Sequence, residues 1–495
     1  MAKMDPKRLS ALGLTAPCGQ DVAVTGVALD SREVARGYLF AALPGTRVHG
    51  AEFTGYAVRM GAGAILTDRV GAAIAADALT GSQAVLVVVE DPKAAFAHAC
   101  ALWFGAQPET VVAVTGTNGK TSVASFTRQI WAALDREAAN IGTTGVEGAF
   151  CAPGIHTTPD ALTLHRLLAD MAGAGVDHVA MEASSHGLDQ RRLDGVRLAA
   201  AAFSNITQDH LDYHPDFIAY LAAKAALFDR VLPEDGVAVV NIDDPHGPHM
   251  AEIAAARGQD LITVGRRAGA DLHITGQRFD PTGQMLRFDW EDRSHQVRLD
   301  LIGGFQAENA ALAACLAIGA GADPDRVIAA LPGLTTVRGR MQLAATRRSG
   351  AAVFVDYAHT PDAVATALEA LRPHVMGRLT AIIGAGGDRD RGKRPLMGQA
   401  AAQFADAVIV TDDNPRTEDP ATIRAAVRAG CPGAMEVADR AEAILRGVDT
   451  LGPGDALLIC GKGHETGQIV GTDVLPFDDA EQASLAVSVL DGGAA

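Results

Sequence analysis

The chain alternates short apolar runs with stretches in which apolar residues recur at helical spacing. The run 111–115 is typical of a buried strand, and 122–134 has the pattern of a helix. Further apolar runs at 176–181, 199–203 and 236–240 are far enough apart to hold helices between them. This order of elements predicts an α/β protein with a mostly parallel sheet.

The same alternation extends to both ends of the 495-residue chain, a length that suggests three domains at roughly 150 residues each. We predict a smaller N-terminal α/β domain over 1–91, a central domain over 92–337 and a C-terminal Rossmann-like domain over 338–495. Strands are expected in the N-terminal domain at 22–24, 38–40 and 84–89, with a helix over 51–61. Strands are expected in the C-terminal domain at 353–355, 379–383, 407–410 and 456–460.

Composition narrows the classes of protein and of partner. Hydrophobic residues make up 48% of the chain and charged residues 20%, as in soluble globular proteins, and the net charge of -17 argues against a nucleic-acid partner. Six scattered cysteines show neither zinc spacing nor a disulfide framework, which fits the reducing cytoplasm. No signal peptide is evident, and uncharged runs such as 309–322 are shorter than the ~20 residues of a membrane span. We expect a cytoplasmic monomer with small-molecule ligands and no membrane insertion.

A glycine turn at 115–121 joins the strand at 111–115 to the helix that follows. Free N–H groups at the start of a helix, together with the helix dipole, favour a phosphate there. Gly116 and Gly119 allow close approach of the ligand, Lys120 supplies a cation, and the Thr121 hydroxyl can bind Mg²⁺. The turn therefore predicts a central domain of the P-loop ATPase type.

The spacing departs from the standard P-loop, which has glycine where Val114 stands. An ordinary turn between strand and helix, without a ligand, is the alternative interpretation of these residues alone.

Two more polar segments of the central domain follow apolar runs. Glu182 comes after the run 178–181, where a cap or a solvated loop residue is the simpler interpretation. The segment 205–214 holds two histidines and two aspartates within six residues, which suits either a metal site or a polar loop. Lys224, in the helical stretch 217–227, has by pattern alone the features of an exposed surface lysine.

Polar clusters follow all four expected strands of the C-terminal domain, at 356–362, 384–391, 411–416 and 461–465. Ligands in parallel α/β sheets bind at the carboxyl ends of strands. The clusters provide two cations, Arg389 and Arg416, and two anions, Asp413 and Glu465. Such a pocket suits a zwitterion.

In order along the chain, these motifs resemble those of the Mur ligase family, which joins amino acids to carboxylates. The resemblance rests on the ordered set and on no single motif. Its main elements are Thr-Gly-Thr-Asn-Gly-Lys-Thr at 115–121, Glu-Ala-Ser-Ser-His at 182–186, His-Leu-Asp-Tyr-His at 210–214, Asp-Asn-Pro-Arg at 413–416 and Gly-Lys-Gly-His-Glu at 461–465. Within the family, Asp-Asn-Pro-Arg resembles the motif of members that add diaminopimelate and not lysine.

The resemblance implies an enzyme that makes an amide bond at the expense of ATP in peptidoglycan precursor synthesis. ATP would phosphorylate the D-glutamate γ-carboxylate of UDP-N-acetylmuramoyl-L-alanyl-D-glutamate, and an amine of meso-2,6-diaminopimelate would attack the acyl phosphate. Mg²⁺ is the implied cofactor, and ATP is a co-substrate.

The resemblance also implies a role for particular residues. The expected ATP-binding residues are Thr115, Gly116, Thr117, Asn118, Gly119, Lys120, Thr121, Asn309, Arg340 and Asp356. The expected contacts of the UDP-linked substrate are Leu29, Ser31, Thr46, Arg47, Val48, His156, Thr157, Thr158, Ser184, Gln190 and Arg192. Diaminopimelate would meet Arg389, Asp413, Asn414, Pro415, Arg416, Gly461 and Glu465.

Catalysis would depend on Lys120, Lys224 and His210, and the implied Mg²⁺ ligands are Thr121, Glu182, His210 and Lys224. Lys224 would act as a carbamate, because this modification converts a cation that repels Mg²⁺ into an oxygen anion that binds it.

Other functions remain open from the sequence. A lysine-adding Mur ligase would be expected to lack Arg416. A folylpolyglutamate synthase would be expected to lack the segments 29–32 and 40–46, which resemble the uridine-nucleotide-binding segments of the Mur ligases that add the third peptide residue. Outside enzymes, a nucleotide-dependent switch would need the glycine turn but no acceptor site.

Overall fold

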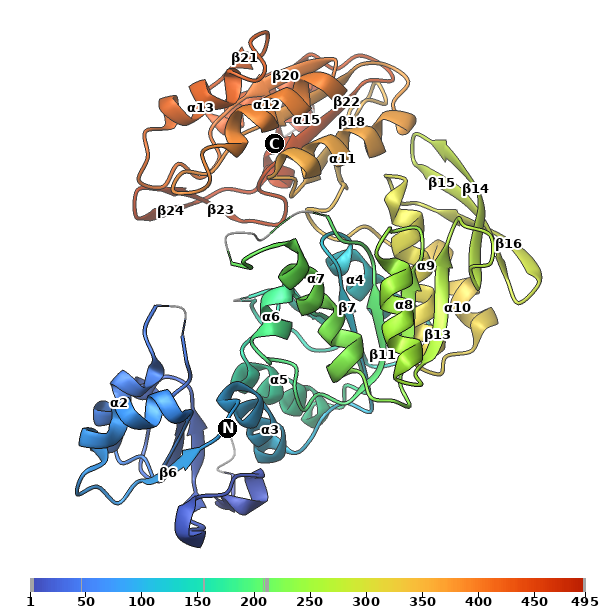
Figure 1. Ribbon diagram of the computed structural model, residues 1–495. Coiled ribbons are helices and arrows are strands. Elements are labelled where there is room, and N and C mark those ends of the chain that lie inside the picture. Colours follow the sequence, from blue (N-terminus) through green and yellow to red (C-terminus); the bar gives the residue numbers. More distant parts are fainter. Residues whose placement is uncertain (1–3, 46, 155, 208, 210–212, 493–495) are drawn as a thin grey trace. The chain divides into compact units, whose positions relative to one another are not determined.

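The computed structural model describes residues 4–45, 47–154, 156–207, 209 and 213–492 (Figure 1). The chain forms two compact units, one made of Met1–Val264 with Leu312–Val327 and the other of Gly265–Ala311 with Ile328–Ala495. The boundaries of the three predicted domains remain a prediction.

The first unit begins with a four-stranded parallel sheet in the order β3-β4-β5-β6. Its strands are β3 Gly26–Ala28, β4 Tyr38–Ala41, β5 Ala64–Thr67 and β6 Val85–Val88. Helices α1 (Thr54–Arg59) and α2 (Arg69–Leu79) pack on one face, and α3 (Pro92–Phe104) packs on the other. The pair β1 (Lys7–Arg8) and β2 (Ala23–Val24) lies before this sheet in the chain. The expected strands near 38–40 and 84–89 are confirmed, whereas β5 and α2 were not predicted.

The same unit holds a larger sheet in which β13, β12, β11, β7, β10, β8 and β9 are neighbours in that order. All of these pairs are parallel except β8 with β9. The strands are β7 Thr110–Thr115, β8 Ala138–Gly142, β9 Gly145–Gly148, β10 His178–Glu182, β11 Leu198–Phe203, β12 Val237–Asn241 and β13 Asp260–Gly265. The central parallel sheet predicted from the apolar runs is therefore confirmed.

Helices cover both faces of this sheet. Helix α4 (Lys120–Ala133) follows β7 and packs against β8 and β10. Other helices contribute apolar side chains to a core on the opposite face, namely α5 Ala161–Gly173, α6 Ser185–Asp189, α7 Phe217–Ala226 and α8 Gly247–Ala256. Strand β7 lies between β11 and β10, so the loop after it emerges at the middle of the sheet.

An antiparallel meander, which the sequence did not predict, begins the second unit. It consists of β14 Leu272–Asp280, β15 Gly283–Trp290 and β16 Arg293–Leu299. Glu291 and Asp292 have φ values of 48° and 60°, as a two-residue hairpin turn of type I′ requires. Helices α9 (Phe305–Gly319) and α10 (Pro324–Ala330) come next in the chain.

The C-terminal sheet has the order β17-β18-β22-β19-β20-β21 and is parallel apart from β17. Its strands are β17 Gln342–Thr346, β18 Ala352–Asp356, β19 Leu379–Ile383, β20 Ala407–Val410, β21 Met435–Glu436 and β22 Ala456–Cys460. A separate hairpin is formed by β23 Gly467–Val470 and β24 Asp473–Pro476.

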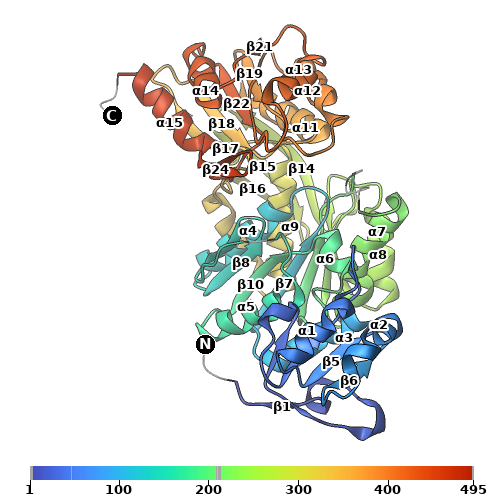
Figure 2. The same cartoon turned by 90° about the vertical axis from the view of Figure 1, so that its left-hand side faces the viewer.

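Helices form the outer layers of the C-terminal sheet, as Figure 2 shows. One layer contains α11 Pro361–Leu371, α12 Lys393–Phe404 and α13 Pro420–Arg428, and the other contains α14 Arg440–Asp449 and α15 Asp479–Leu490. Because β18, β22, β19 and β20 are neighbours and parallel, the four polar clusters that follow them meet at one edge. The clusters thus follow neighbouring strands, and the pocket predicted from them stays a prediction. Among the helices described, none is long and apolar enough to cross a membrane.

Candidate active site

The loop between β7 and α4 requires glycine at two positions. Gly119 has φ of 87° and lies at the N-cap of α4, so that a side chain there would be strained. A Cβ atom on Gly116 would lie 1.9 Å from the Ser204 Oγ atom and 3.0 Å from the Asn205 carbonyl oxygen, so a side chain there would displace Ser204. The glycines therefore let the chain turn tightly enough to direct backbone N–H groups to the start of α4.

A second loop holds this turn in place. The Asn118 backbone N–H donates to the Asn205 Oδ1 atom at 2.9 Å, and the Thr117 N–H donates to the Asn205 carbonyl at 2.8 Å. The Ser204 hydroxyl donates to the Asn118 carbonyl at 2.6 Å. Ser204 and Asn205 follow β11, the neighbour of β7. The sequence singled out the segment 205–214 as a metal site or polar loop, but neither Ser204 nor Asn205 was predicted to be a site residue. Their position after a strand adjacent to the loop is the signal that could have found them.

Two lysines meet at one carbonyl of the loop. Lys120 donates from Nζ to the carbonyls of Gly116 and Thr117, at 2.9 Å each. Lys224 Nζ donates to the same Gly116 carbonyl at 2.6 Å, and its side chain is only 1% exposed. The pattern-based interpretation of Lys224 as a surface lysine is therefore wrong.

Burial and the charge of Lys120 hold the pKa of the Lys224 amine well below its ordinary value, and Asp209 opposes this shift. A lysine with a lowered pKa has a larger fraction of neutral amine, the form that reacts with carbon dioxide.

Glu182 ends β10 as a fixed, buried carboxylate with 1% exposure. The Thr143 backbone N–H donates to its Oε1 atom at 2.8 Å, and a Cβ atom on Gly142 would lie 2.1 Å from that oxygen. Thr143 and Thr157 hydroxyls are 3.1 Å apart, which places Thr157 beside the same group. The carboxylate is thus held by Thr143, the residue after β8, and Thr157 of the loop before α5 contacts the Thr143 hydroxyl.

Several residues expected to contact the UDP-linked substrate also gather around Glu182. The Thr158 hydroxyl donates to the Glu182 carbonyl at 2.8 Å and accepts from the Ser184 N–H at 3.0 Å. Arg192 donates to the Thr158 carbonyl at 2.6 Å and to Gln190 Oε1 at 2.7 Å. Desolvation lowers the pKa of Arg192, opposed by the charge of Asp160. The structure therefore brings Thr157, Thr158, Ser184, Gln190 and Arg192 together.

The remaining residues expected to contact the UDP-linked substrate lie elsewhere in the chain. Leu29 and Ser31 follow β3, and Arg47 and Val48 are exposed after the neighbouring strand β4. His156 is exposed. Thr46 and His210 lie outside the described residues.

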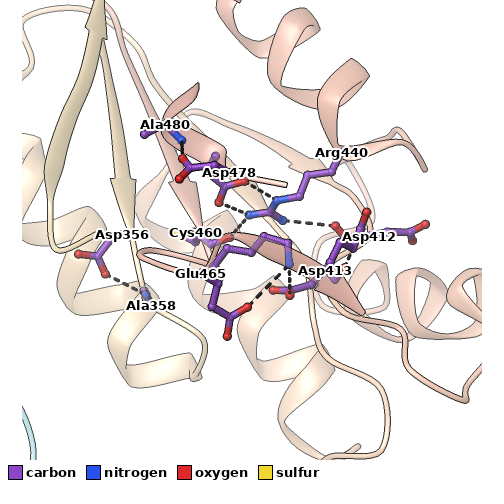
Figure 3. Close-up of polar contacts among 12 residues, drawn as sticks. Asp356, Ala358, Asp412, Asp413, Arg440, Cys460, Glu465, Asp478 and Ala480 are labelled. Carbon is purple, nitrogen blue, oxygen red and sulfur yellow. Dashed lines mark hydrogen bonds and ion pairs between the residues drawn. The ribbon is translucent and has the colours of Figure 1, made fainter. Parts of the chain in front are cut away.

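In the C-terminal domain, a buried lysine joins three expected contacts of diaminopimelate. Lys462 has a fully buried side chain, and its Nζ donates to Asn414 Oδ1 at 2.7 Å. The same nitrogen lies 3.7 Å from both Asp413 Oδ1 and Glu465 Oε2. Figure 3 shows the side chains of Asp413 and Glu465. Asn414 Nδ2 donates to Glu465 Oε2 at 2.9 Å. Burial lowers the pKa of Lys462, and Asp413 opposes this.

Lys462 belongs to the Gly-Lys-Gly-His-Glu motif, but it was not among the site residues predicted from the sequence. Its place two residues after β22 is the signal that could have identified it.

Arg416 and Arg389 flank one glycine turn. Arg416 has φ of 51°, unusual for a residue with a side chain, and its guanidinium donates to the Gly387 carbonyl at 2.9 Å. A Cβ atom on Gly386 would lie 2.8 Å from Arg416 NH1 and 3.7 Å from Arg389 Cγ. The carbonyl of Pro415 packs against Gly387, where a Cβ would be 1.9 Å away. The two arginines expected to bind a carboxylate therefore lie beside the same turn.

Asp356 ends β18 and accepts hydrogen bonds from the N–H groups of Met341, at 2.7 Å, and Ala358, at 2.9 Å. Desolvation raises its pKa, and the nearby Arg340 opposes this. The Arg340 guanidinium lies 4.9 Å from the centre of the Tyr357 ring. Asn309, in α9, donates to Gln306 at 3.0 Å.

The fold and these strand-end sites define a nucleotide-dependent ligase, and sequence comparisons agree. Family models match residues 23–103 (Mur ligase family, catalytic domain), 114–317 (Mur ligase middle domain) and 339–463 (Mur ligase, glutamate ligase domain). The chain belongs to the Mur ligase family. The predicted family, fold class and class of enzyme, an ATP-dependent amide-forming ligase, are thereby confirmed.

Two relatives and one solved structure similar to this chain carry the same description. The chain is 48% identical to the UDP-N-acetylmuramoyl-L-alanyl-D-glutamate–2,6-diaminopimelate ligase of Caulobacter vibrioides, over 98% of this chain and 99% of that protein. It is 50% identical to the enzyme of the same description from Bradyrhizobium diazoefficiens, over 94% and 95%. A solved structure of that description matches with a TM-score of 0.73 at 34% identity, covering 98% of this chain and 99% of the other.

The donors near the loop differ in how well they fit Mg²⁺. Among the described residues, no group of three or more His, Cys, Asp and Glu side chains could hold a metal. Glu182 and Thr121 offer oxygen atoms of the kind that Mg²⁺ prefers, whereas Lys224 as an amine does not. The oxygen donors fit Mg²⁺, and Lys224 fits only after modification.

Proposed function

We propose that this protein is the ATP-dependent ligase that adds meso-2,6-diaminopimelate to the D-glutamate γ-carboxylate of UDP-N-acetylmuramoyl-L-alanyl-D-glutamate. The observation that carries the proposal is the identity of 48% and 50% to ligases described by that substrate and that amino acid, over nearly the full length of each chain. The product would be a precursor of peptidoglycan, and the expected location is the cytoplasm. The expected monomer remains a prediction.

The first half of the reaction activates a carboxylate. Without activation, an amine that attacks the carboxylate would have to displace an oxide ion, which is too poor a leaving group. Transfer of a phosphoryl group from ATP gives an acyl phosphate with a good leaving group. Such transfer depends on positioning and on neutralising charge. The loop N–H groups and Lys120 support this role, because Lys120 Nζ is held at the loop by two carbonyls 2.9 Å away.

Thr121 and Glu182, with His210 and carbamylated Lys224, would hold Mg²⁺. When bound, Mg²⁺ would neutralise charge on the phosphate oxygens. The buried position of Lys224 and its lowered pKa support the carbamate, because both favour a neutral amine that can be modified. Asn309, Arg340 and Asp356 complete the ATP-binding residues that we propose.

The UDP-linked substrate would be bound by Leu29, Ser31 and the segment 46–48 at its nucleotide end. Its remaining contacts would be His156, Thr157, Thr158, Ser184, Gln190 and Arg192. Support for the second group comes from two hydrogen bonds of the Thr158 hydroxyl, which donates to the Glu182 carbonyl and accepts from the Ser184 N–H. The sugar, pyrophosphate and peptide carboxylate of this substrate offer acceptors for such hydroxyl and guanidinium groups.

In the second half, an amine of diaminopimelate attacks the acyl phosphate and gives the amide and inorganic phosphate, the ADP having been formed in the first half. Arg416 and Arg389 would bind the carboxylate that lysine lacks, and Asp413 and Glu465 would receive the adjacent ammonium. Asn414, Pro415 and Gly461 complete this site. Both arginines lie beside the same glycine turn, at Gly386, and this supports the assignment.

The test is phosphate release by the purified protein with ATP and each substrate present or omitted. We expect release only when both UDP-N-acetylmuramoyl-L-alanyl-D-glutamate and meso-diaminopimelate are present. Equal turnover with lysine would replace the proposal by the lysine-adding alternative. Release that needs neither acceptor nor amino acid would indicate a nucleotide-dependent switch instead.

A further inference from the structure

A buried ion pair contacts the backbone next to the proposed amino-acid site. Arg440, the first residue of α14, and Asp479, the first residue of α15, both have fully buried side chains. Arg440 donates from Nε to Asp479 Oδ1 and from NH2 to Asp479 Oδ2, at 2.7 Å each. This fork geometry fixes the plane of the guanidinium.

The other donors of Arg440 point to the backbone of two strand ends (Figure 3). NH2 donates to the Cys460 carbonyl at 2.9 Å, and NH1 donates to the Asp412 carbonyl at 3.3 Å. Cys460 is the last residue of β22, and Asp412 lies two residues beyond β20. These strands are not neighbours, because β19 lies between them. Arg440 therefore links two segments that the sheet itself does not join.

The residues that follow these two carbonyls belong to the proposed site. Asp413 follows Asp412, and Gly461 and Lys462 follow Cys460. The two segments are closely packed, since a Cβ atom on Gly461 would lie 2.4 Å from Asp413 Oδ2. Any change in their separation would move the Asp413 carboxylate relative to Lys462 and to Glu465.

We propose that Arg440, held by Asp479, is a positioning residue for the diaminopimelate site. It sets the distance between the segment that carries Asp413 and the segment that carries Lys462 and Glu465. The inference rests on the proposed function, because it assigns these groups to the amino-acid substrate. Arg440 touches no substrate in this account and acts only through the two carbonyls.

A buried ion pair can also be merely structural, and the two roles predict different results. Replacing both members of such a pair by apolar residues of similar volume often leaves stability unchanged or raised. A structural role therefore predicts normal kinetics for Arg440→Met/Asp479→Leu. Our proposal predicts impaired binding of diaminopimelate even in a well-folded variant, because methionine cannot donate to the carbonyls of Asp412 and Cys460.

The experiment is steady-state kinetics with each of the three substrates varied in turn. For Arg440→Lys and for the double variant we expect the KM for diaminopimelate to rise about 10- to 100-fold, since small misplacements cost this much. The KM values for ATP and the UDP-linked substrate should stay within about twofold, and kcat should change far less than the diaminopimelate KM. Arg440→Lys keeps the charge and covers the case in which the double variant does not fold.

The matched control is the ion pair Arg347–Asp491 in the same domain, which also includes a bond from Arg347 to a backbone carbonyl, that of Val448. Arg347 follows β17 at the edge of the sheet opposite the proposed site, so Arg347→Met/Asp491→Leu should leave the KM for diaminopimelate unchanged.

A wild-type KM for diaminopimelate in folded Arg440→Lys and double variants would overturn the positioning role while leaving the proposed function intact. If the unaltered enzyme does not consume diaminopimelate at all, the proposed function fails and the inference fails with it.

Discussion

Lys120 and Lys224 donate hydrogen bonds to the same oxygen atom, the carbonyl of Gly116, at 2.9 Å and 2.6 Å. Two ammonium groups so close together repel each other, and the pKa of Lys224 is lowered by burial and by this neighbour. At this loop, therefore, Lys224 is predisposed to lose its charge beside a second lysine.

Lys120→Ala removes the cation beside the transferring phosphate. We expect kcat to fall about 10²- to 10³-fold, as when a donor to transition-state charge is lost. Circular dichroism should show an unchanged fold, because Lys120 is only partly buried. Near-normal kcat in a folded variant would contradict the role of Lys120.

Lys224→Ala tests the carbamate. The variant should be almost inactive and partly rescued by acetate or propionate, which would supply the missing carboxylate in the space left by the side chain. Lys224→Met is the matched control, because its side chain fills that space and rescue should fail. Mass spectrometry of active enzyme, with labelled carbon dioxide trapped on Lys224, checks the modification directly. Full activity with an unmodified Lys224 amine would contradict the carbamate.

Arg416→Ala and Arg416→Lys test the choice of amino acid. The guanidinium can grip the far carboxylate of diaminopimelate in a bidentate manner, which lysine as a substrate cannot satisfy. A site built for a polar group can reject an analogue without it by roughly 10⁴-fold. We expect a large rise in the KM for diaminopimelate and little change in the other two KM values.

Arg428→Lys, at a partly exposed arginine paired with Glu436 in the same domain, is the control for Arg416 and should have no effect. A wild-type KM for diaminopimelate in the Arg416 variants would show that another residue selects the amino acid.

His165 predicts a dependence of stability on pH. It lies in α5 with 1% exposure, and burial lowers its pKa to about 4, with the hydrogen bond to the Asp194 carbonyl opposing and His98 adding to the shift. Between pH 6.5 and about 4 the unfolded chain binds a proton that the folded protein does not. The free energy of unfolding should therefore fall as pH falls through this window, by at most about 1.4 kcal/mol per pH unit for this group.

Urea unfolding of His165→Gln at pH 7 and pH 5 checks this, because glutamine keeps a donor for Asp194 but does not titrate. The difference between the two pH values should shrink in His165→Gln and stay unchanged in His249→Gln, an exposed control. An equal pH dependence in all three proteins would contradict the assignment to His165.

Local sequence was enough for much of the fold. The strands expected at 379–383, 407–410 and 456–460 begin and end at the predicted residues, because each is a short apolar run bounded by polar or glycine residues. The β14–β16 meander was missed, since its strands carry polar and charged residues on the half that faces away from the core.

The sequence by itself determined the motifs, their order and the glycine turn of 115–121, because these depend on residues adjacent in the chain. Only the tertiary structure decided that Lys224 meets Gly116, 108 residues away, and that Arg440 pairs with Asp479, 39 residues away. A helical pattern cannot reveal a buried lysine or arginine when the group that accepts its hydrogen bonds lies on another element. Such partners are set by how strands and helices pack, and packing is a property of the whole fold.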